Sequence, residues 1–182
     1  MKVSVECCAA MQRKSFSRMP CPIARSLEVV GEGWSLLILR DVFIGVRRFQ
    51  DLEQRLGISS STLTRRLAHL CRHGLLDAHA YAERPTRWEY TLTAKGEDLL
   101  QVLLAIGAWG NRWFTDAIVP VDAQSGTRVE PVLVDRASGL ALTAGNVALA
   151  AGPGANVKLR AFLEPPRLLG AAASRVDVGG RA

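Results

Sequence analysis

Residues 59–76 read SSSTLTRRLAHLCRHGLL, a stretch in which small hydroxyls come first, cations follow and a glycine comes near the end. Leu63, Leu67 and Leu70 recur at intervals of four and three, which predicts a helix with one apolar face. The polar residues of the stretch are spaced so that they share the opposite face. They are Thr62, Arg65, Arg66, His69, Arg72 and His73. Cations gathered on one side of a helix suit a polyanionic partner.

The hydroxyls at the start of this stretch have a chemical use of their own. The first turn of a helix offers free N–H groups and the positive end of the helix dipole, and both favour a phosphate. Ser60, Ser61 and Thr62 are small enough for the helix end to come close to the floor of a DNA groove. Arg65 and Arg66 would then reach base edges or phosphates, because a guanidinium pairs bidentately with guanine.

The element before this helix is short and is followed by a glycine. In FQDLEQRLG, Leu52 and Leu56 lie on the inward stripe of a predicted helix, and Gly57 suits the turn after it. Either Ser59 or Ser60 then caps the next helix. Two helices joined by a short turn, the second carrying hydroxyls and cations, have the layout of a helix-turn-helix.

A basic hairpin is predicted directly after this pair of helices. LLDAHAY (75–81) and WEYTL (88–92) alternate apolar and polar residues, as two paired strands do. The turn between them carries Arg84, Thr86 and Arg87. A hairpin with a cationic tip at this position is a wing, which would contact a phosphate backbone or enter a minor groove.

The ordered part of the chain is predicted to begin at Cys21 and Pro22, with the proline at the first helical position, where its missing N–H costs nothing. Ile23 and Leu27 then lie on one apolar face. WSLLILRDVF (34–43) is apolar almost all round and predicts the most buried helix. Cys21 is open to two interpretations: a redox sensor, since a helix N-terminus favours the thiolate, or a cap residue beside a subunit contact.

A long final helix is predicted over TAKGEDLLQVLLAIGAWGNRWF (93–114), with Thr93 as its cap. Apolar residues recur along it at alternating spacings of four and three, which is the pattern of a helix–helix seam. The seam residues are Leu99, Leu103, Ile106, Gly110 and Trp113, and Leu100, Val102 and Trp109 form a second apolar edge. One small domain does not readily cover both edges, so we expect a partner subunit to do so.

Composition and motifs exclude several other classes of function. The net charge of +6, with 23 Lys/Arg against 17 Asp/Glu, is a mild basic surplus that lies mainly in residues 1–115. The sequence has no Gly-rich phosphate loop, no nucleophile motif and no recognisable carboxylate pair, so we expect neither an enzyme nor a cofactor. The four cysteines have no CxxC spacing, which argues against a zinc site and a disulfide framework. No apolar run is long enough for a membrane span and residues 1–20 do not form a signal peptide, so we expect a cytoplasmic protein.

Four regions are predicted along the chain. Residues 1–20 form a flexible segment, and residues 21–115 form a domain for DNA binding and dimerisation. Residues 116–166 form a small extension, with short strands expected at 129–135, 140–144 and 146–151. Residues 167–182 form a disordered tail. The predicted fold class is therefore mainly α with a small β-hairpin wing (α+β).

From Met11 to Trp113 the sequence resembles the HxlR-type winged-helix regulators, relatives of the MarR group. Five blocks carry the resemblance in the family's order and spacing: CPIARSLEVVGEGW, LLILRD, GVRRFQDLEQRLGIS, LTRRLAHLCRHGLL and RWEYTLTAKG. The resemblance implies a homodimer that binds double-stranded DNA, with the first and last helices at the subunit contact. It also implies that Cys21 occupies the position where some members sense quinones, aldehydes or oxidants. Longer members carry a cysteine pair in the extension, but here Asp135 and Ser138 stand in its place, so we expect no metal.

Together the motifs and the resemblance define two sets of candidate residues. The residues expected to contact DNA are Arg47, Arg48, Ser60, Ser61, Thr62, Thr64, Arg65, Arg66, His69, Arg84, Thr86 and Arg87. Those expected at the dimer interface are Ile23, Leu27, Leu99, Leu103, Ile106, Trp109, Gly110 and Trp113.

Three alternatives remain open at the level of sequence. A winged helix sometimes binds a protein instead of DNA, although such a module need not concentrate arginines on both helix and wing. Trp34, Trp109 and Trp113 either line a pocket for a flat small-molecule effector or simply pack in the core and interface. Cys71, next to Leu70, is more typical of a small buried hydrophobe than of a sensor.

Overall fold

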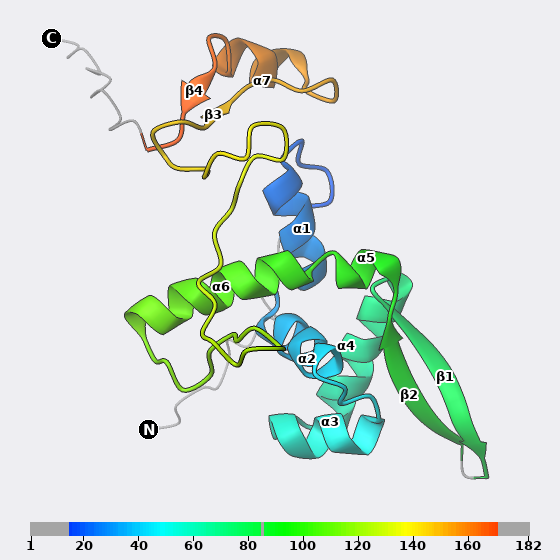
Figure 1. The fold of residues 1–182 in the computed structure, drawn as a ribbon. Helices are drawn as coiled ribbons and strands as arrows, with labels where there is room; N and C mark the ends of the chain where they lie inside the picture. The colour runs from blue at the N-terminus through cyan, green and yellow to red at the C-terminus, as the bar shows by residue number, and fades with distance from the viewer. Residues whose placement is uncertain (1–14, 85, 171–182) are drawn as a thin grey trace, which may run out of the picture. The chain divides into compact units, whose positions relative to one another are not determined.

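The computed structural model describes residues 15–84 and 86–170, and the chain divides between Thr91 and Leu92 into two units. The first unit contains α1 (Pro22–Val30), α2 (Gly33–Phe43), α3 (Phe49–Leu56), α4 (Ser60–Arg72), β1 (Leu76–Glu83) and nearly all of β2 (Thr86–Leu92) (Figure 1). The second unit begins at the end of β2 and contains the long helix. The expected domain over 21–115 is thus divided close to the end of the wing.

The core of the first unit is built around α2, which packs against α1, α3 and α4. Ile38 and Leu39 of α2 are completely buried, as the apolar character of residues 34–43 predicts. The surrounding elements each contribute aliphatic side chains to the same core. These are Val30, Leu52, Ile58, Leu63, Leu67, Leu70, Leu75 and Leu76. The leucine pattern of residues 59–76 therefore identifies the inward face of α4 correctly.

Local signals fix the ends of the helices that matter for the site. Pro22 occupies the first turn of α1, with Cys21 at the N-cap. Gly57 follows α3 in a left-handed conformation (φ 61°), which a residue with a Cβ adopts only with strain. Ser59 caps α4, its hydroxyl accepting a hydrogen bond from the Thr62 amide at 3.4 Å. Gly74 has φ 65° and ends α4 in the same way.

β1 and β2 form a two-stranded sheet that continues directly from the helix-turn-helix. Arg48, in the segment between α2 and α3, forms an isolated bridge to Glu89 of β2, and the Tyr90 amide donates to the carbonyl of Arg47 at 2.8 Å. The segment before α3 thereby lies along the outer edge of β2. Helices with this small sheet make a winged helix, and the mainly α fold class with a hairpin wing is confirmed.

The second unit begins with two helices where the sequence predicts one. Thr93 caps α5 (Ala94–Glu97), its side-chain oxygen accepting from the Gly96 amide at 3.1 Å, and α6 spans Leu100–Trp113. Between them the Leu99 amide bonds to the carbonyl three residues back, on Gly96, so the helix tightens for one turn before α6 begins.

The extension after α6 differs from the three predicted strands. Residues 129–135 and 140–144 meet at a single bridge, Val134 to Ala141. The only paired strands of the described extension are β3 (Ala148–Leu149) and β4 (Arg167–Leu168), which run antiparallel on either side of α7 (Val157–Phe162). Residues 167–170, expected in a disordered tail, are thus ordered by strand pairing; residues 171–182 and 1–14 lie outside the described residues.

Candidate nucleic-acid interface

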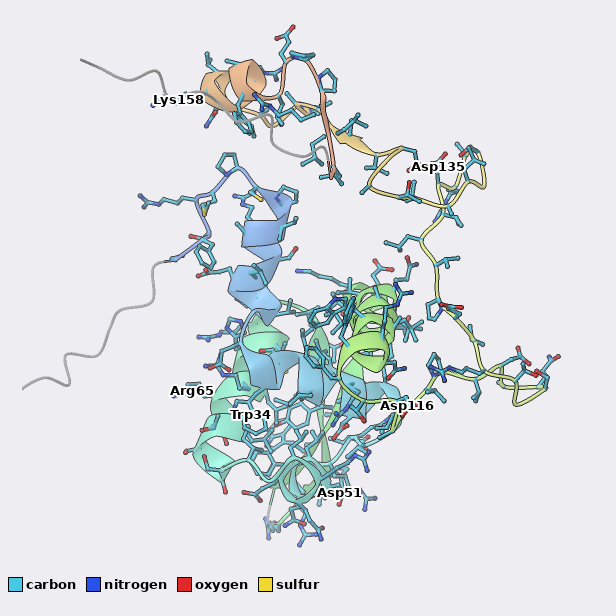
Figure 2. All side chains as sticks on the ribbon, turned by 90° about the vertical axis from the view of Figure 1, so that its left-hand side faces the viewer. Trp34, Asp51, Arg65, Asp116, Asp135 and Lys158 are labelled. Atoms are coloured by element: carbon cyan, nitrogen blue, oxygen red, sulfur yellow. The ribbon has the colours of Figure 1, made fainter. Side chains whose placement is uncertain are left out.

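One side of α4 is free of contact with the other helices of its unit. Ser61, Thr64, Arg65, Ala68 and Arg72 are all exposed, and they lie at spacings that bring them onto one side of the helix. Figure 2 shows Arg65 on the outer side of α4, pointing away from the neighbouring helices. Ser61, Thr64 and Ala68 on this side are small. Arg65 lies in the middle of the helix, and Arg72 lies at its end. We call these five residues the outer face of α4.

Arg66 and His69, expected on the same face as Arg65, lie on a different side. The Arg66 guanidinium pairs with the Glu32 carboxylate at 2.8 Å, and the Arg66 side chain is only 16% exposed. The His69 Nε2 atom lies 3.0 Å from the carbonyl oxygen of Val29. Both partners belong to the end of α1 and the turn before α2, so this side of α4 is packed within the unit.

Helix geometry explains the difference. Successive side chains on a helix are separated by about 100°, so Thr62, Arg66, His69 and His73 lie on one flank of the leucine stripe, and the outer face of α4 lies opposite the stripe. Sequence periodicity locates the leucine stripe but does not say which neighbouring element covers a flank. Here the turn between α1 and α2 covers it. The His73 ring lies beside the His69 ring on this flank, with ring centroids 4.5 Å apart and the ring planes tilted by 54°.

The hydroxyls at the start of α4 are partly engaged within the protein. The Ser59 hydroxyl donates to Thr62 Oγ1 at 2.9 Å, and the Ser60 hydroxyl donates to Glu53 Oε1 in α3. Ser60 is nevertheless exposed, as is Ser61. The Ser60–Glu53 bond joins the first turn of α4 to α3, and the Ser59–Thr62 bond lies within that turn, so the geometry of the helix start is fixed before any ligand arrives.

The wing and the segment beside it carry the other exposed cations of the predicted set. Arg84, Thr86 and Arg87 at the tip of the hairpin are exposed, and so are Arg47 and Arg48. The Arg48 guanidinium carbon lies 5.0 Å from the centre of the Tyr81 ring, a cation–π contact that orients this arginine over β1. The wing is therefore cationic both at its tip and along the edge nearest α3.

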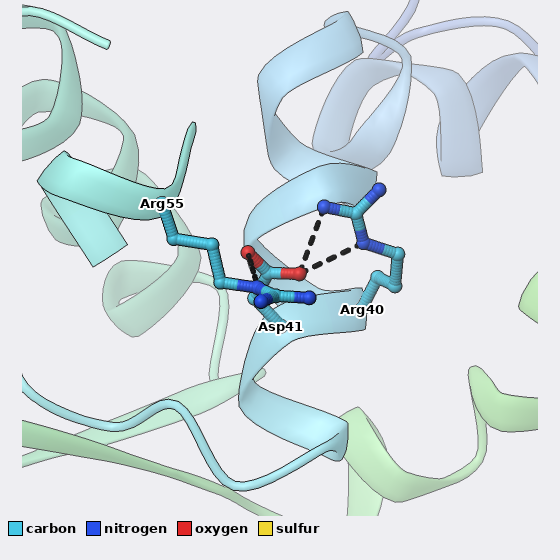
Figure 3. Close-up of polar contacts among 3 residues, drawn as sticks. All are labelled: Arg40, Asp41 and Arg55. Atoms are coloured by element: carbon cyan, nitrogen blue, oxygen red, sulfur yellow. Dashed lines mark hydrogen bonds and ion pairs between the residues drawn. The ribbon is translucent and has the colours of Figure 1, made fainter. Parts of the chain in front are cut away.

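A buried acid fixes the position of α3, and sequence analysis did not single it out. Asp41 of α2 is completely buried; one of its oxygens lies 2.8 Å from the Arg40 guanidinium and the other lies 3.1 Å from Arg55 Nε of α3 (Figure 3). Arg40 and Arg55 keep part of their surface in water. The aspartate in the otherwise apolar run LLILRDVF was the available signal, because a charge in such a helix needs a partner.

The two described cysteines occupy different environments. Cys21 is partly exposed at the N-cap of α1, and its side chain makes no capping hydrogen bond. Burial, followed by the negative charge of Asp77, raises the pKa of the Cys71 thiol. Burial also raises the pKa of Tyr90, with a further contribution from Cys71. Cys71 is thus a packed thiol near the base of the wing.

The residues expected at a dimer interface are largely uncovered. Ile23 and Leu27 of α1 are 70% and 47% exposed, and α6 has no buried residue at all. Ile106, Trp109 and Trp113 of α6 are 46%, 57% and 67% exposed. Leu99, Leu103 and Gly110 are half-buried. Apolar side chains exposed in such number along a helix are typical of a surface that another protein surface covers.

The described residues hold no candidate metal centre and no candidate membrane span. Within 15–84 and 86–170, no three His, Cys, Asp or Glu side chains are grouped so as to hold an ion. In the extension, the Ser138 hydroxyl donates to the Asp135 carboxylate at 2.7 Å, so these two residues bond to one another. No helix of the same ranges has the length and apolarity needed to cross a bilayer.

Comparison with known proteins identifies relatives across most of the chain. The model of the HxlR-like helix-turn-helix family matches residues 29–117. The HTH-type transcriptional regulator Rv3095 of Mycobacterium tuberculosis is 40% identical over 141 residues, covering 75% of this chain and 89% of the relative. The regulator sll1512 of Synechocystis is 42% identical over 94 residues, which are 51% of this chain and 70% of the relative.

Solved structures agree with these relatives. The transcription factor PA1374 of Pseudomonas aeruginosa is 43% identical to this chain. The match spans 79% of this chain and all of PA1374, with a TM-score of 0.59. A second transcription factor, PA1607, is 35% identical to this chain. The match spans 76% of this chain and all of PA1607, with a TM-score of 0.69. These relatives are transcriptional regulators and not enzymes, in agreement with the motif analysis.

Proposed function

Because the chain belongs to the HxlR-like helix-turn-helix family of transcriptional regulators, we propose that it binds a specific sequence of double-stranded DNA as a homodimer. The observation that carries this proposal is the outer face of α4, on which small residues lie beside two exposed arginines, Arg65 and Arg72. A major groove admits an α-helix only where side chains at the point of contact allow close approach.

The roles of the individual residues follow from their positions on this face. Ser61, Thr64 and Ala68 are small and lie at the centre, so the helix backbone comes near the bases. Arg65 then reaches a base edge, where a guanidinium pairs bidentately with guanine O6 and N7. Arg72, nearer the helix end, reaches a phosphate. Such a division between base contact and backbone contact is general in protein–DNA complexes.

The wing supplies the second contact with DNA. Arg84 and Arg87 are exposed at its tip and meet the phosphate backbone or the adjacent minor groove, and Thr86 between them donates a hydroxyl. Arg47 and Arg48 add positive charge along the edge of the same sheet. Arg66 and His69, in contrast, have partners within the unit, so we assign them to positioning α4 and not to base recognition.

Dimerisation through α6, with a contribution from α1, is the second part of the proposal. The exposed apolar residues of α6 support it, because an apolar helix face left in water is unfavourable until a partner covers it. Two-fold symmetry makes the target an inverted repeat, with the two recognition helices about 34 Å apart in successive major grooves.

The third part of the proposal is that a chemical signal at Cys21 regulates DNA binding. Cys21 lies at the start of α1, where the thiol is partly exposed, and oxidation or addition of an electrophile there would alter a helix at the expected subunit contact. The angle between the two recognition helices would then change, and with it the affinity for the operator.

Selection from a pool of random duplexes with the purified chain tests the proposal. We expect enrichment of an inverted repeat whose half-sites are roughly one helical turn apart. Recovery of single half-sites would contradict dimeric binding, and recovery of no common sequence would contradict specific recognition.

A further inference from the structure

The second unit contains a pocket that the proposed DNA contacts do not use. After α6 the chain reverses direction and passes back across the helix (Figure 1), and the space between has a volume of about 580 Å³. This volume lies within the roughly 300–1,000 Å³ typical of small-molecule sites. Its walls come from the last turns of α6 and from residues 120–131.

The walls combine an aromatic surface with a surplus of positive charge. Trp109, Val129 and Pro131 supply apolar surface, while Arg112, Arg128 and Glu130 supply charge. Two guanidinium groups against one carboxylate leave the pocket cationic. An indole ring beside arginines suits a flat ring that carries a negative group, since the ring stacks and the group pairs with a guanidinium.

Neither arginine is held strongly by the protein. Arg112 lies 3.8 Å from Glu130, and their side chains are 72% and 85% exposed, so this ion pair contributes little. For Arg128, no side-chain ion pair or hydrogen bond is formed with any residue of 15–84 and 86–170. Both guanidinium groups are therefore available to an incoming anion.

The loop that carries Arg128 keeps its conformation through hydrogen bonds between its own residues. The Asp122 carboxylate accepts from the Ser125 amide and hydroxyl, each at 2.8 Å. Val121 and Arg128 then face one another in a bridge, and the Val129 amide donates to the Pro120 carbonyl at 2.9 Å. The loop that forms the wall opposite α6 thus has a defined internal conformation before a ligand binds, which lowers the entropic cost of binding.

We propose that this pocket binds a planar aromatic anion, of the class of aromatic carboxylates, as the effector of the regulator. The binding claim stands on the pocket alone, whereas the effector role rests on the proposed function. Trp109 belongs both to the pocket and to the exposed edge of α6, so a bound ring would alter the surface that we assign to the dimer.

Calorimetric titration of the full chain tests the site, with 1-naphthoate as the probe and neutral 1-naphthalenemethanol as its match. We expect naphthoate to bind and the alcohol to bind much more weakly. Arg128→Gln should weaken naphthoate binding roughly ten-fold or more, because a charge-assisted hydrogen bond is lost. Arg136→Gln, an exposed arginine outside the pocket walls, is the matched control and should bind as the unaltered chain does.

A second variant is expected to bind naphthoate more tightly, a result that a general loss of structure would not produce. Glu130→Gln removes the negative charge that a pocket wall presents to an incoming anion, so naphthoate should bind up to a few-fold more tightly. Absence of naphthoate binding, equal binding of the alcohol, or unchanged binding by Arg128→Gln would overturn the site. DNA binding measured without naphthoate tests the proposed function separately, so the failure of one is distinguishable from the failure of the other.

Discussion

Arg66 of α4 and Glu32 at the N-cap of α2 form an ion pair of 2.8 Å in which both side chains are largely withdrawn from water. This pair joins the proposed recognition helix to the turn between the first two helices. Next to it, Arg66 Nε and the second Glu32 oxygen are buried without a hydrogen-bond partner among the described residues. The pair therefore fixes the orientation of α4 at a cost in desolvation.

The first prediction concerns this pair. Removing one partner leaves a charge that is poorly solvated, so Arg66→Gln or Glu32→Gln should each lower the free energy of unfolding by about 1–3 kcal/mol. The double variant should lose less than the sum, because the two residues interact. Urea unfolding measures all three. Arg65→Gln, one residue away on the exposed side, is the control and should change stability little; additive losses would show that the pair is not coupled.

A second prediction concerns the wing. Arg87→Ala should weaken binding to all duplexes by a similar factor and reduce the slope of log affinity against log salt by about one, because one phosphate contact is lost. Fluorescence anisotropy over a series of salt concentrations gives that slope. Arg136→Ala, with an exposed arginine in the extension, should leave the slope unchanged. A loss confined to one DNA sequence would instead assign Arg87 to base recognition.

The third prediction concerns α6. Ile106 is 46% exposed on the face that we assign to the dimer, so Ile106→Glu should place a charge in the interface and dissociate the subunits. Operator binding should fall with it, since one half-site alone binds weakly. Leu140→Glu alters another exposed apolar residue, in the extension, and should leave the dimer intact. Sedimentation velocity measures both; an intact dimer for Ile106→Glu would mean that the interface lies elsewhere.

The fourth prediction separates the two described cysteines. The pKa of Cys71 is raised in the folded protein, so its thiol stays protonated up to a higher pH than in the unfolded chain. Alkylation of Cys71 should therefore be slow at mildly alkaline pH, and unfolding should accelerate it. Because the pKa of Cys71 is higher in the folded than in the unfolded chain, the protonated thiol contributes to the stability of the fold below pH 9.0, the pKa in the unfolded chain. This contribution is lost as the pH rises from 9.0 through the folded pKa. Mass spectrometry of iodoacetamide-treated protein, folded and in urea, measures the rate.

Cys21 should behave differently under the same treatment. Partly exposed at the start of α1, it should be the more reactive of the two cysteines in the folded protein. If it is the sensor, diamide should release the unaltered chain from DNA and leave Cys21→Ser bound. Equal release of both proteins would assign the response to another group.

Much of the first unit follows from short-range signals in the sequence. The leucine spacing of α4, the glycine after α3, the serine cap and the alternation of the wing strands all specify local backbone geometry, and each occurs where it was expected. The sequence does not reveal which neighbouring element covers a given flank of α4. Arg66 and Arg65 are neighbours in sequence with the same chemistry, and only the position of Glu32 distinguishes them.

The extension was predicted less well for a related reason. Runs such as VEPVLVD suggest strands, yet a strand requires a partner along its length. Here the chain turns back after a few residues, and the two sides of each turn pair at a single bridge. In two of those turns an aspartate accepts from a serine three residues later: Asp122 from Ser125 and Asp135 from Ser138. Hydrogen bonds from the Ser125 amide and hydroxyl lower the pKa of the Asp122 carboxyl, and those from the Ser138 hydroxyl and amide lower the pKa of the Asp135 carboxyl. Each turn is complete within a few residues, so no extended strand is needed.

The most direct test of the account is the affinity of the unaltered chain and of Arg65→Ala for two duplexes at one salt concentration. One duplex carries the selected inverted repeat, and the other differs by a single base pair in each half-site, at the position that Arg65 is proposed to read. The unaltered chain should prefer the first duplex by about 1–3 kcal/mol per altered base pair, and Arg65→Ala should bind both about equally. A preference of the same size in Arg65→Ala, or no preference in the unaltered chain, would contradict recognition of DNA sequence by the outer face of α4.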